Sequence, residues 1–164
     1  GGVPHNHTGG LALSLGQRAA VLEVSYAAVD AFLDRLDPDT FDAWLALGHD
    51  MRATNVKLET LGRNTKGRPD VRGVPGGGDE IEPGGPSTCA SLLLCGCNPG
   101  REYDVSDNAG DYLCNYVLFR GQRRFPTKPV GFLHLPPPEV LPLVTQHQQI
   151  ASLMRSLEKT VAGP

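Results

Sequence analysis

The sequence has no long hydrophobic run and no excess of basic residues. Its longest apolar stretches, such as residues 92–94, are far too short to cross a bilayer. Lysine and arginine total 15 against 18 aspartate and glutamate residues, which gives a net charge of -3. Proteins that bind nucleic acids or anionic membranes usually carry a basic excess. The composition therefore argues against both as partners.

The sequence also has few cysteines and no recognisable secretory signal. The four cysteines, at positions 89, 95, 97 and 114, are not spread as a disulfide framework would be. No basic segment followed by an apolar one opens the chain. We therefore expect reduced thiols and a cytoplasmic location. The glycine-rich stretches at 73–78 and 83–86 lack the lysine and hydroxyl residues of a phosphate-binding loop, so we interpret them as flexible loops.

What remains is ordinary globular composition: 164 residues, 40% hydrophobic and 20% charged. Apolar periodicity predicts short strands alternating with helices, which is typical of a layered α/β domain. Strands are predicted at residues 21–24, 41–47, 56–58, 103–106 and 130–135, and helices at residues 25–36, 113–119 and 146–162. The polar segment 62–86 is predicted to be one long functional loop.

Cys114 lies where a predicted strand passes through a turn of small residues into a helix. A thiol in the first turn of a helix faces the positive end of the peptide dipoles and nearby backbone N–H groups, which favours the thiolate nucleophile. The alternative is a buried cysteine that acts as a small hydrophobe. From spacing alone this alternative is the more common situation.

Glu59 and His134 are each predicted at the carboxyl end of a strand, where catalytic groups gather in open α/β sheets. By itself, His134 fits a satisfied core histidine and Glu59 a solvated surface carboxylate. Together with Cys114 they would bring a nucleophile, a base and an orienting acid to one face of the sheet.

Three segments carry a resemblance to a known family. Residues 106–116 contain Ser-x-x-Ala-Gly-x-Tyr-x-Cys-Asn, residues 131–136 contain Gly-Phe-x-His-x-Pro, and Leu58-Glu59 is followed by Asn64 and Arg68-Pro69-Asp70. These segments resemble the pyroglutamyl peptidase I family of cysteine peptidases, also called pyrrolidone-carboxylate peptidases. The order Glu, Cys, His also agrees with that family.

The resemblance implies a three-layer α/β/α fold whose open, twisted sheet is largely parallel and sandwiched between helices. It implies removal of N-terminal pyroglutamate from peptides through a catalytic triad of Glu59, Cys114 and His134 and a thioester intermediate, with no metal or organic cofactor. It makes Arg68 a candidate for stabilising the oxyanion, and His49 and Asn64 candidates for binding substrate. It also implies a homo-oligomer, either a dimer or a tetramer.

The sequence departs from the family pattern in three places, one of which is the spacing from Asn64 to Arg68, which is one residue tighter. The sequence also starts after the family's first strand and its loop with two phenylalanines, and the segment between residues 86 and 106 is shortened. We therefore expect residues 1–164 to form a single peptidase domain without that first strand and loop. A degenerate member that binds blocked peptide N-termini without cutting them is one alternative. A metal- or redox-handling protein that uses Cys89, Cys95 and Cys97 is another.

Overall fold

The computed structural model describes residues 6–95 and 103–161 of the chain. Its main sheet has the strand order β1-β6-β2-β5, formed by β1 (Trp44–His49), β6 (Val130–Leu135), β2 (Lys57–Glu59) and β5 (Asp104–Ser106). The β1–β6 and β2–β5 pairs are parallel, whereas β2 and β6 are antiparallel. The expectation of an open, largely parallel sheet is therefore confirmed, with one antiparallel step at its centre.

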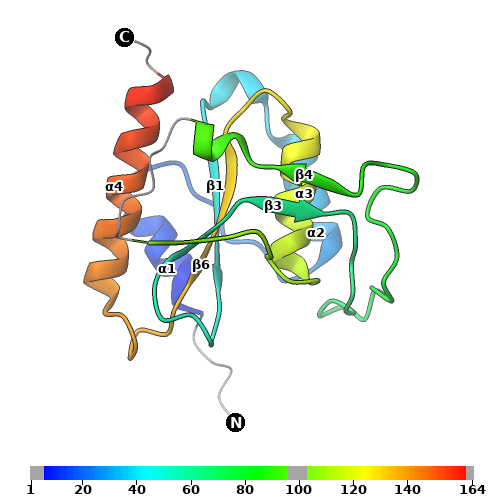
Figure 1. Cartoon of the computed structure of the whole chain (residues 1–164), viewed down its shortest axis with the longest axis horizontal. Helices are drawn as coiled ribbons and strands as arrows, with labels where there is room; N and C mark the ends of the chain where they lie inside the picture. The colour runs from blue at the N-terminus through cyan, green and yellow to red at the C-terminus, as the bar shows by residue number, and fades with distance from the viewer. Residues whose placement is uncertain (1–5, 96–102, 162–164) are drawn as a thin grey trace.

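Helices cover both faces of this sheet, so the expected three layers are present (Figure 1). Helices α2 (Tyr26–Arg35) and α3 (Leu113–Arg124) pack on one face, and α1 (His7–Ser14) and α4 (Leu143–Val161) pack on the other. The alternation of side chains along β6 builds both cores. Val130 and Phe132 point to the α2–α3 side, and Leu133 and Leu135 to the α1–α4 side.

Most of the predicted elements are present with shifted ends. The α2 helix begins where the Ser25 side chain accepts a hydrogen bond from the backbone N–H of Ala28, as expected for an N-cap. Residues 130–135 form β6 as predicted, and α4 begins three residues earlier than expected. The strand predicted at residues 21–24 is wrong. No strand pairs with that segment, and its valines, Val21 and Val24, remain exposed.

The segment predicted as one long loop contains additional structure at its ends. The strands β3 (Leu61–Arg63) and β4 (Thr88–Ala90) pair as a two-stranded antiparallel sheet at the two ends of this segment. Short 3-10 turns lie outside it, at Pro38–Thr40 (η1) and Leu92–Cys95 (η2). Between β3 and β4 the loop is closed on itself by an isolated bridge between Lys66 and Asp79. Among the described residues, no helix combines the length and apolar character needed to span a bilayer.

Candidate active site

Glu59 and His134 meet across the antiparallel pair at the centre of the main sheet. Glu59 is paired in register with Phe132, so His134 lies two residues further along β6 on the same face. The Oε1 atom of Glu59 lies 2.7 Å from Nδ1 of His134. The Glu59 side chain is fully buried and His134 is 8% exposed. This is a buried, hydrogen-bonded acid–base pair and neither residue occupies the surface position that its type usually takes.

The expected reason for this meeting was wrong. We predicted that parallel strands would deliver both side chains at their carboxyl ends, on one edge of the sheet. Instead β2 runs antiparallel to β6, so the two strands end at opposite edges. The residues meet because alternate positions of neighbouring strands share a face, which makes Glu59 and His134 diagonal neighbours.

Cys114 is the second residue of α3, whose N-cap is Tyr112 in an extended conformation. It therefore lies in the first helical turn, where backbone N–H groups have no partner within the helix. Its thiol is half-buried and faces Gly48 of β1, the residue paired in register with His134. A Cβ atom on Gly48 would lie 3.3 Å from Sγ of Cys114 and 2.4 Å from the Phe132 ring. Because Gly48 has no side chain, the backbone of β1, the Phe132 ring and the Cys114 sulfur can approach one another closely.

His134 is held between the other two members of the group. Burial by itself lowers the pKa of the imidazole, but hydrogen bonds and charge interactions with Cys114 and Glu59 raise it more, to about 9. The imidazolium form is therefore favoured at neutral pH. The Phe132 ring packs against the imidazole with its centroid 4.9 Å away, which fixes its plane from one side.

Asn115, next to the thiol, has a role that sequence analysis did not assign. Its side chain is fully buried, accepts a hydrogen bond from the backbone N–H of Arg63, and donates to the carbonyl oxygens of Arg63 and Thr65. These bonds attach the first turn of α3 to the strand that follows Glu59. Gly48 was also missed. A glycine near the end of an otherwise apolar strand is the signal that could have indicated this close approach.

The other predicted site residues lie in different surroundings. His49 ends β1, and its ring packs edge-on against that of His7 with 4.9 Å between centroids. Burial, and then His7, lowers the pKa of His49. Its Nε2 atom is buried and has no hydrogen-bond partner within the described part of the chain. His49 shares the α1–α4 face of β1 with Leu45 and Leu47, opposite the face on which Gly48 meets Cys114, and its predicted contact with substrate stays a prediction.

The side-chain amide of Asn64 is engaged with the backbone of Glu82. Its Nδ2 donates to the carbonyl of Glu82 and its Oδ1 accepts from the N–H of the same residue. Both ends of the amide thus hold the loop, and the predicted substrate-binding role of Asn64 stays a prediction. Arg68 forms an ion pair with Asp111, with 3.1 Å between Nε and Oδ1. Its predicted oxyanion role stays a prediction.

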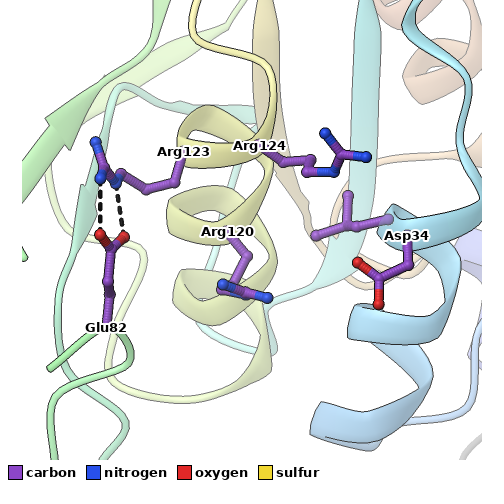
Figure 2. A pocket seen from close by; sticks show the side chains of 6 residues that line it. Asp34, Glu82, Arg120, Arg123 and Arg124 are labelled. Atoms are coloured by element: carbon purple, nitrogen blue, oxygen red, sulfur yellow. Dashed lines mark hydrogen bonds and ion pairs between the residues drawn. The ribbon is translucent and has the colours of Figure 1, made fainter.

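A cavity of about 250 Å³ lies elsewhere, at the other end of α3 (Figure 2). It is lined by Leu33, Asp34, Glu82, Arg120, Arg123 and Arg124, and by none of the Glu59, Cys114 and His134 group. Two of its cations are already engaged, Arg123 with Glu82 and Arg120 with Asp30. Three of the charged side chains that line the cavity, Glu82, Arg120 and Arg123, therefore already form ion pairs.

The alternative of a metal site finds no support in residues 6–95 and 103–161, where no group of three potential ligand side chains comes together. Cys89 is half-buried, and burial raises the pKa of its thiol, which disfavours the thiolate that binds metals. Cys97 lies outside the described residues. The Cys89, Cys95 and Cys97 set thus stays a prediction without a site.

Comparison with known proteins identifies the family of this fold. No family model and no curated sequence matches the chain. Among solved structures, the pyrrolidone carboxyl peptidase from Thermus thermophilus is 31% identical and superposes with a TM-score of 0.78, covering 95% of this chain and 94% of its own. The pyrrolidone carboxyl peptidase from Fervidobacterium islandicum shares 22% identity with a TM-score of 0.77, covering 96% of this chain and 93% of its own. At this lower identity it supports the fold alone. From the first of these similarities, this chain belongs to the pyrrolidone carboxyl peptidase family.

Proposed function

We propose that this protein is a cysteine peptidase that removes N-terminal pyroglutamate from peptides. The observation that supports this most directly is the buried Glu59–His134 pair with the Cys114 thiol beside it in a first helical turn. The family's solved members carry the same activity in their names. A pyroglutamyl end has no ammonium group, so recognition has to come from the lactam N–H and C=O and from the apolar ring.

In the proposed reaction the Cys114 thiolate attacks the pyroglutamyl carbonyl carbon and a C–S bond forms. The carbonyl oxygen becomes an oxyanion, which the free N–H groups of the first turn of α3 can stabilise. Each such donor typically contributes about 3–4 kcal/mol to lowering the barrier. His134, charged at neutral pH, donates its proton to the departing amine as the C–N bond breaks.

Hydrolysis of the thioester completes the cycle. Neutral His134 takes a proton from water, the resulting hydroxide attacks the acyl carbon, and Cys114 leaves as thiolate. Glu59 holds Nδ1 through this sequence, so that the other ring nitrogen faces the thiol and the positive charge is compensated.

The proposal is tested with a fluorogenic pyroglutamyl-anilide reporter. The wild-type chain should hydrolyse it, and Cys114→Ala and His134→Ala should each lower kcat/KM by about 10⁴-fold or more. Cys89→Ala is the matched control, because it removes a half-buried cysteine away from the site and should leave turnover unchanged. If the wild-type chain binds a pyroglutamyl peptide without cutting it, the protein is a binding protein and the proposed peptidase function is wrong.

A further inference from the structure

Lys57 of β2 is paired in register with His134 in the antiparallel β2–β6 pair. Side chains at directly opposed positions project from the same face of a sheet and come close together. Lys57 therefore lies on the face that carries Glu59 and His134, while Leu58 between them packs on the α1–α4 side. An ammonium in this position disfavours the imidazolium form of His134, because like charges repel.

This ammonium is paired with a carboxylate from the strand on the other side of β6. The Nζ atom of Lys57 lies 3.2 Å from Oδ2 of Asp50, the residue that follows β1. Because the strand order is β1-β6-β2, the ion pair spans β6. The N–H of Asp50 donates to the carbonyl of Leu135, the residue after His134, at 3.0 Å. The pair therefore crosses β6 beside the imidazole.

Asp50 is fixed in place and ionised at neutral pH. Its Oδ1 accepts a hydrogen bond from the backbone N–H of Arg52 at 2.9 Å. Burial by itself raises the pKa of Asp50, but the hydrogen bonds from Arg52 and Lys57 lower it. The charges of Lys57 and His134 lower this pKa further. The Asp50 carboxylate is thus within electrostatic reach of the imidazole as well as of the ammonium.

The other ionisable groups that act on His134 come from three elements. Glu59 on β2 and Cys114 on α3 favour the imidazolium through hydrogen bonds and charge. His49 at the end of β1 would repel it, but burial, and then His7, lower the pKa of His49, so that this ring is neutral at pH 7 and above. The Lys57 ammonium therefore counters Glu59 and Cys114 in the pH range in which His134 titrates.

We propose that Lys57 and Asp50 are positioning residues that set how strongly His134 binds its proton. The Lys57 ammonium weakens the proton binding that Glu59 and Cys114 favour, and Asp50 limits this effect by neutralising the ammonium. The inference rests on the proposed peptidase function, in which His134 donates a proton to the departing amine and then takes one from water. A proton bound with intermediate strength serves both steps.

An NMR titration of the carbon-bound histidine ring protons tests this without requiring turnover. The His134 signal, identified by its loss in His134→Gln, should titrate with a midpoint of about 9 in the wild-type chain. Asp50→Asn leaves the ammonium unbalanced and should lower the midpoint by about half a pH unit. Lys57→Gln leaves the carboxylate alone and should raise the midpoint by about as much.

Two further variants separate charge from structure. Lys57→Arg keeps the charge and should keep the wild-type midpoint. The double variant Asp50→Asn, Lys57→Gln should return to within about 0.2 pH unit of wild type. A purely structural ion pair would weaken the fold when either partner is lost, and would not move the midpoint in opposite directions.

The alkaline limb of kcat/KM on the pyroglutamyl reporter should move with the NMR midpoints. It should lie at lower pH in Asp50→Asn and at higher pH in Lys57→Gln. Both movements should shrink in high salt, because the side chains of Lys57 and Asp50 are 28% and 25% exposed.

The Arg123–Glu82 ion pair provides a matched control. Its side chains are 39% and 33% exposed, its Nε–Oε2 distance is 2.7 Å, and it lies at the other end of α3. Glu82→Gln and Arg123→Gln should leave both the midpoint and the alkaline limb unchanged.

An unmoved His134 midpoint in either Asp50→Asn or Lys57→Gln would overturn the inference, and so would movement of both in the same direction. A different result would overturn the proposed function alone: midpoints that move in opposite directions in a chain that hydrolyses no pyroglutamyl amide. The ion pair would then still set the proton binding of His134.

Discussion

The two ends of α3 differ in how they use polar residues. At the N-terminal end, Asn115 is fully buried, Cys114 is half-buried, and the ionisable partners Glu59 and His134 are inside the sheet layer. At the C-terminal end, Arg120, Arg123 and Arg124 line a cavity, with half-exposed side chains at the two ion-paired arginines (Figure 2). The end with more charge and a cavity has the less reactive chemistry, because its ion pairs are formed between partly exposed side chains.

This difference between the two ends of α3 indicates that a reactive site is recognised by ionisable groups that are buried, at a cost in desolvation free energy, and paired with one another. An exposed Arg–carboxylate pair gains little because water competes for both partners. A buried imidazole between a thiol and a carboxylate has its protonation equilibrium shifted. Four predictions test this difference between the two ends of the helix.

The largest expected effect is on Glu59. Glu59→Gln keeps the shape of the side chain but removes the charge that orients Nδ1 and compensates the imidazolium, so kcat should fall by about 10³–10⁴-fold. Steady-state kinetics on the reporter measures this. Glu82→Gln, which neutralises a carboxylate at the other end of α3, is the control and should retain full turnover. Comparable losses in both variants would remove the distinction between the two ends.

The pH dependence follows from the raised pKa of His134. The proton on His134 is needed to expel the amine, so kcat/KM should fall about tenfold per pH unit above pH 9. The stabilisation that this proton provides is fully present below the unfolded value of about 6.5 and is lost as the pH rises through about 9. In Glu59→Gln one of the two interactions that raise the pKa is gone. The alkaline limb of its residual activity should therefore move to lower pH, and an unmoved limb would contradict the assignment to His134.

Asn115→Ala should reduce stability, since it removes three hydrogen bonds from the fully buried Asn115 side chain to partly buried backbone groups of Arg63 and Thr65. The free energy of unfolding should fall by about 1–3 kcal/mol in urea denaturation. Asn108→Ala is the control, because Asn108 is exposed, its side chain accepts from the N–H of nearby Gly110, and its own backbone N–H, which donates to Ser106, is kept; its change should stay within about 0.5 kcal/mol. Equal losses would mean that Asn115 does not anchor α3.

The smallest effect is expected at the cavity. Arg124 stacks over the ring of neighbouring Phe125 at 5.5 Å and belongs to none of the ion pairs found in the described residues. Arg124→Gln should leave reporter turnover unchanged and shift the unfolding free energy by less than about 0.5 kcal/mol. A clear loss of activity would show that the cavity takes part in catalysis.

The sequence predicts the layered fold and β6 well because the apolar pattern of residues 130–135 reflects burial on both faces. It also indicates the position of Cys114, since turn chemistry and helix starts are local signals. It could not give the direction of β2 beside β6, which depends on the whole sheet. The burial of Glu59 could not be predicted either, because a three-residue strand has too few positions to show a pattern of alternating apolar and polar residues.

The loop between β3 and β4 was hardest to predict. Its order comes partly from pairings between distant residues, such as the hydrogen bond that Asp70 accepts from the backbone N–H of Tyr26. Composition alone gives only glycine, proline and charge. The same limit explains why the two hydrogen bonds between the Asn64 amide and the backbone of Glu82 could not be predicted.

The diagonal placement of Glu59 and His134 makes catalytic competence depend on strand registration. A slip of β2 by a single position would turn Glu59 to the opposite layer, against α1 and α4. The imidazole of His134 would then be buried without its carboxylate partner. For the proposed peptidase, we therefore expect a partly folded or mispaired chain to be inactive until the central strands pair in the correct register. The rate of reporter hydrolysis would therefore also measure the fraction of chains whose sheet has assembled in the native register.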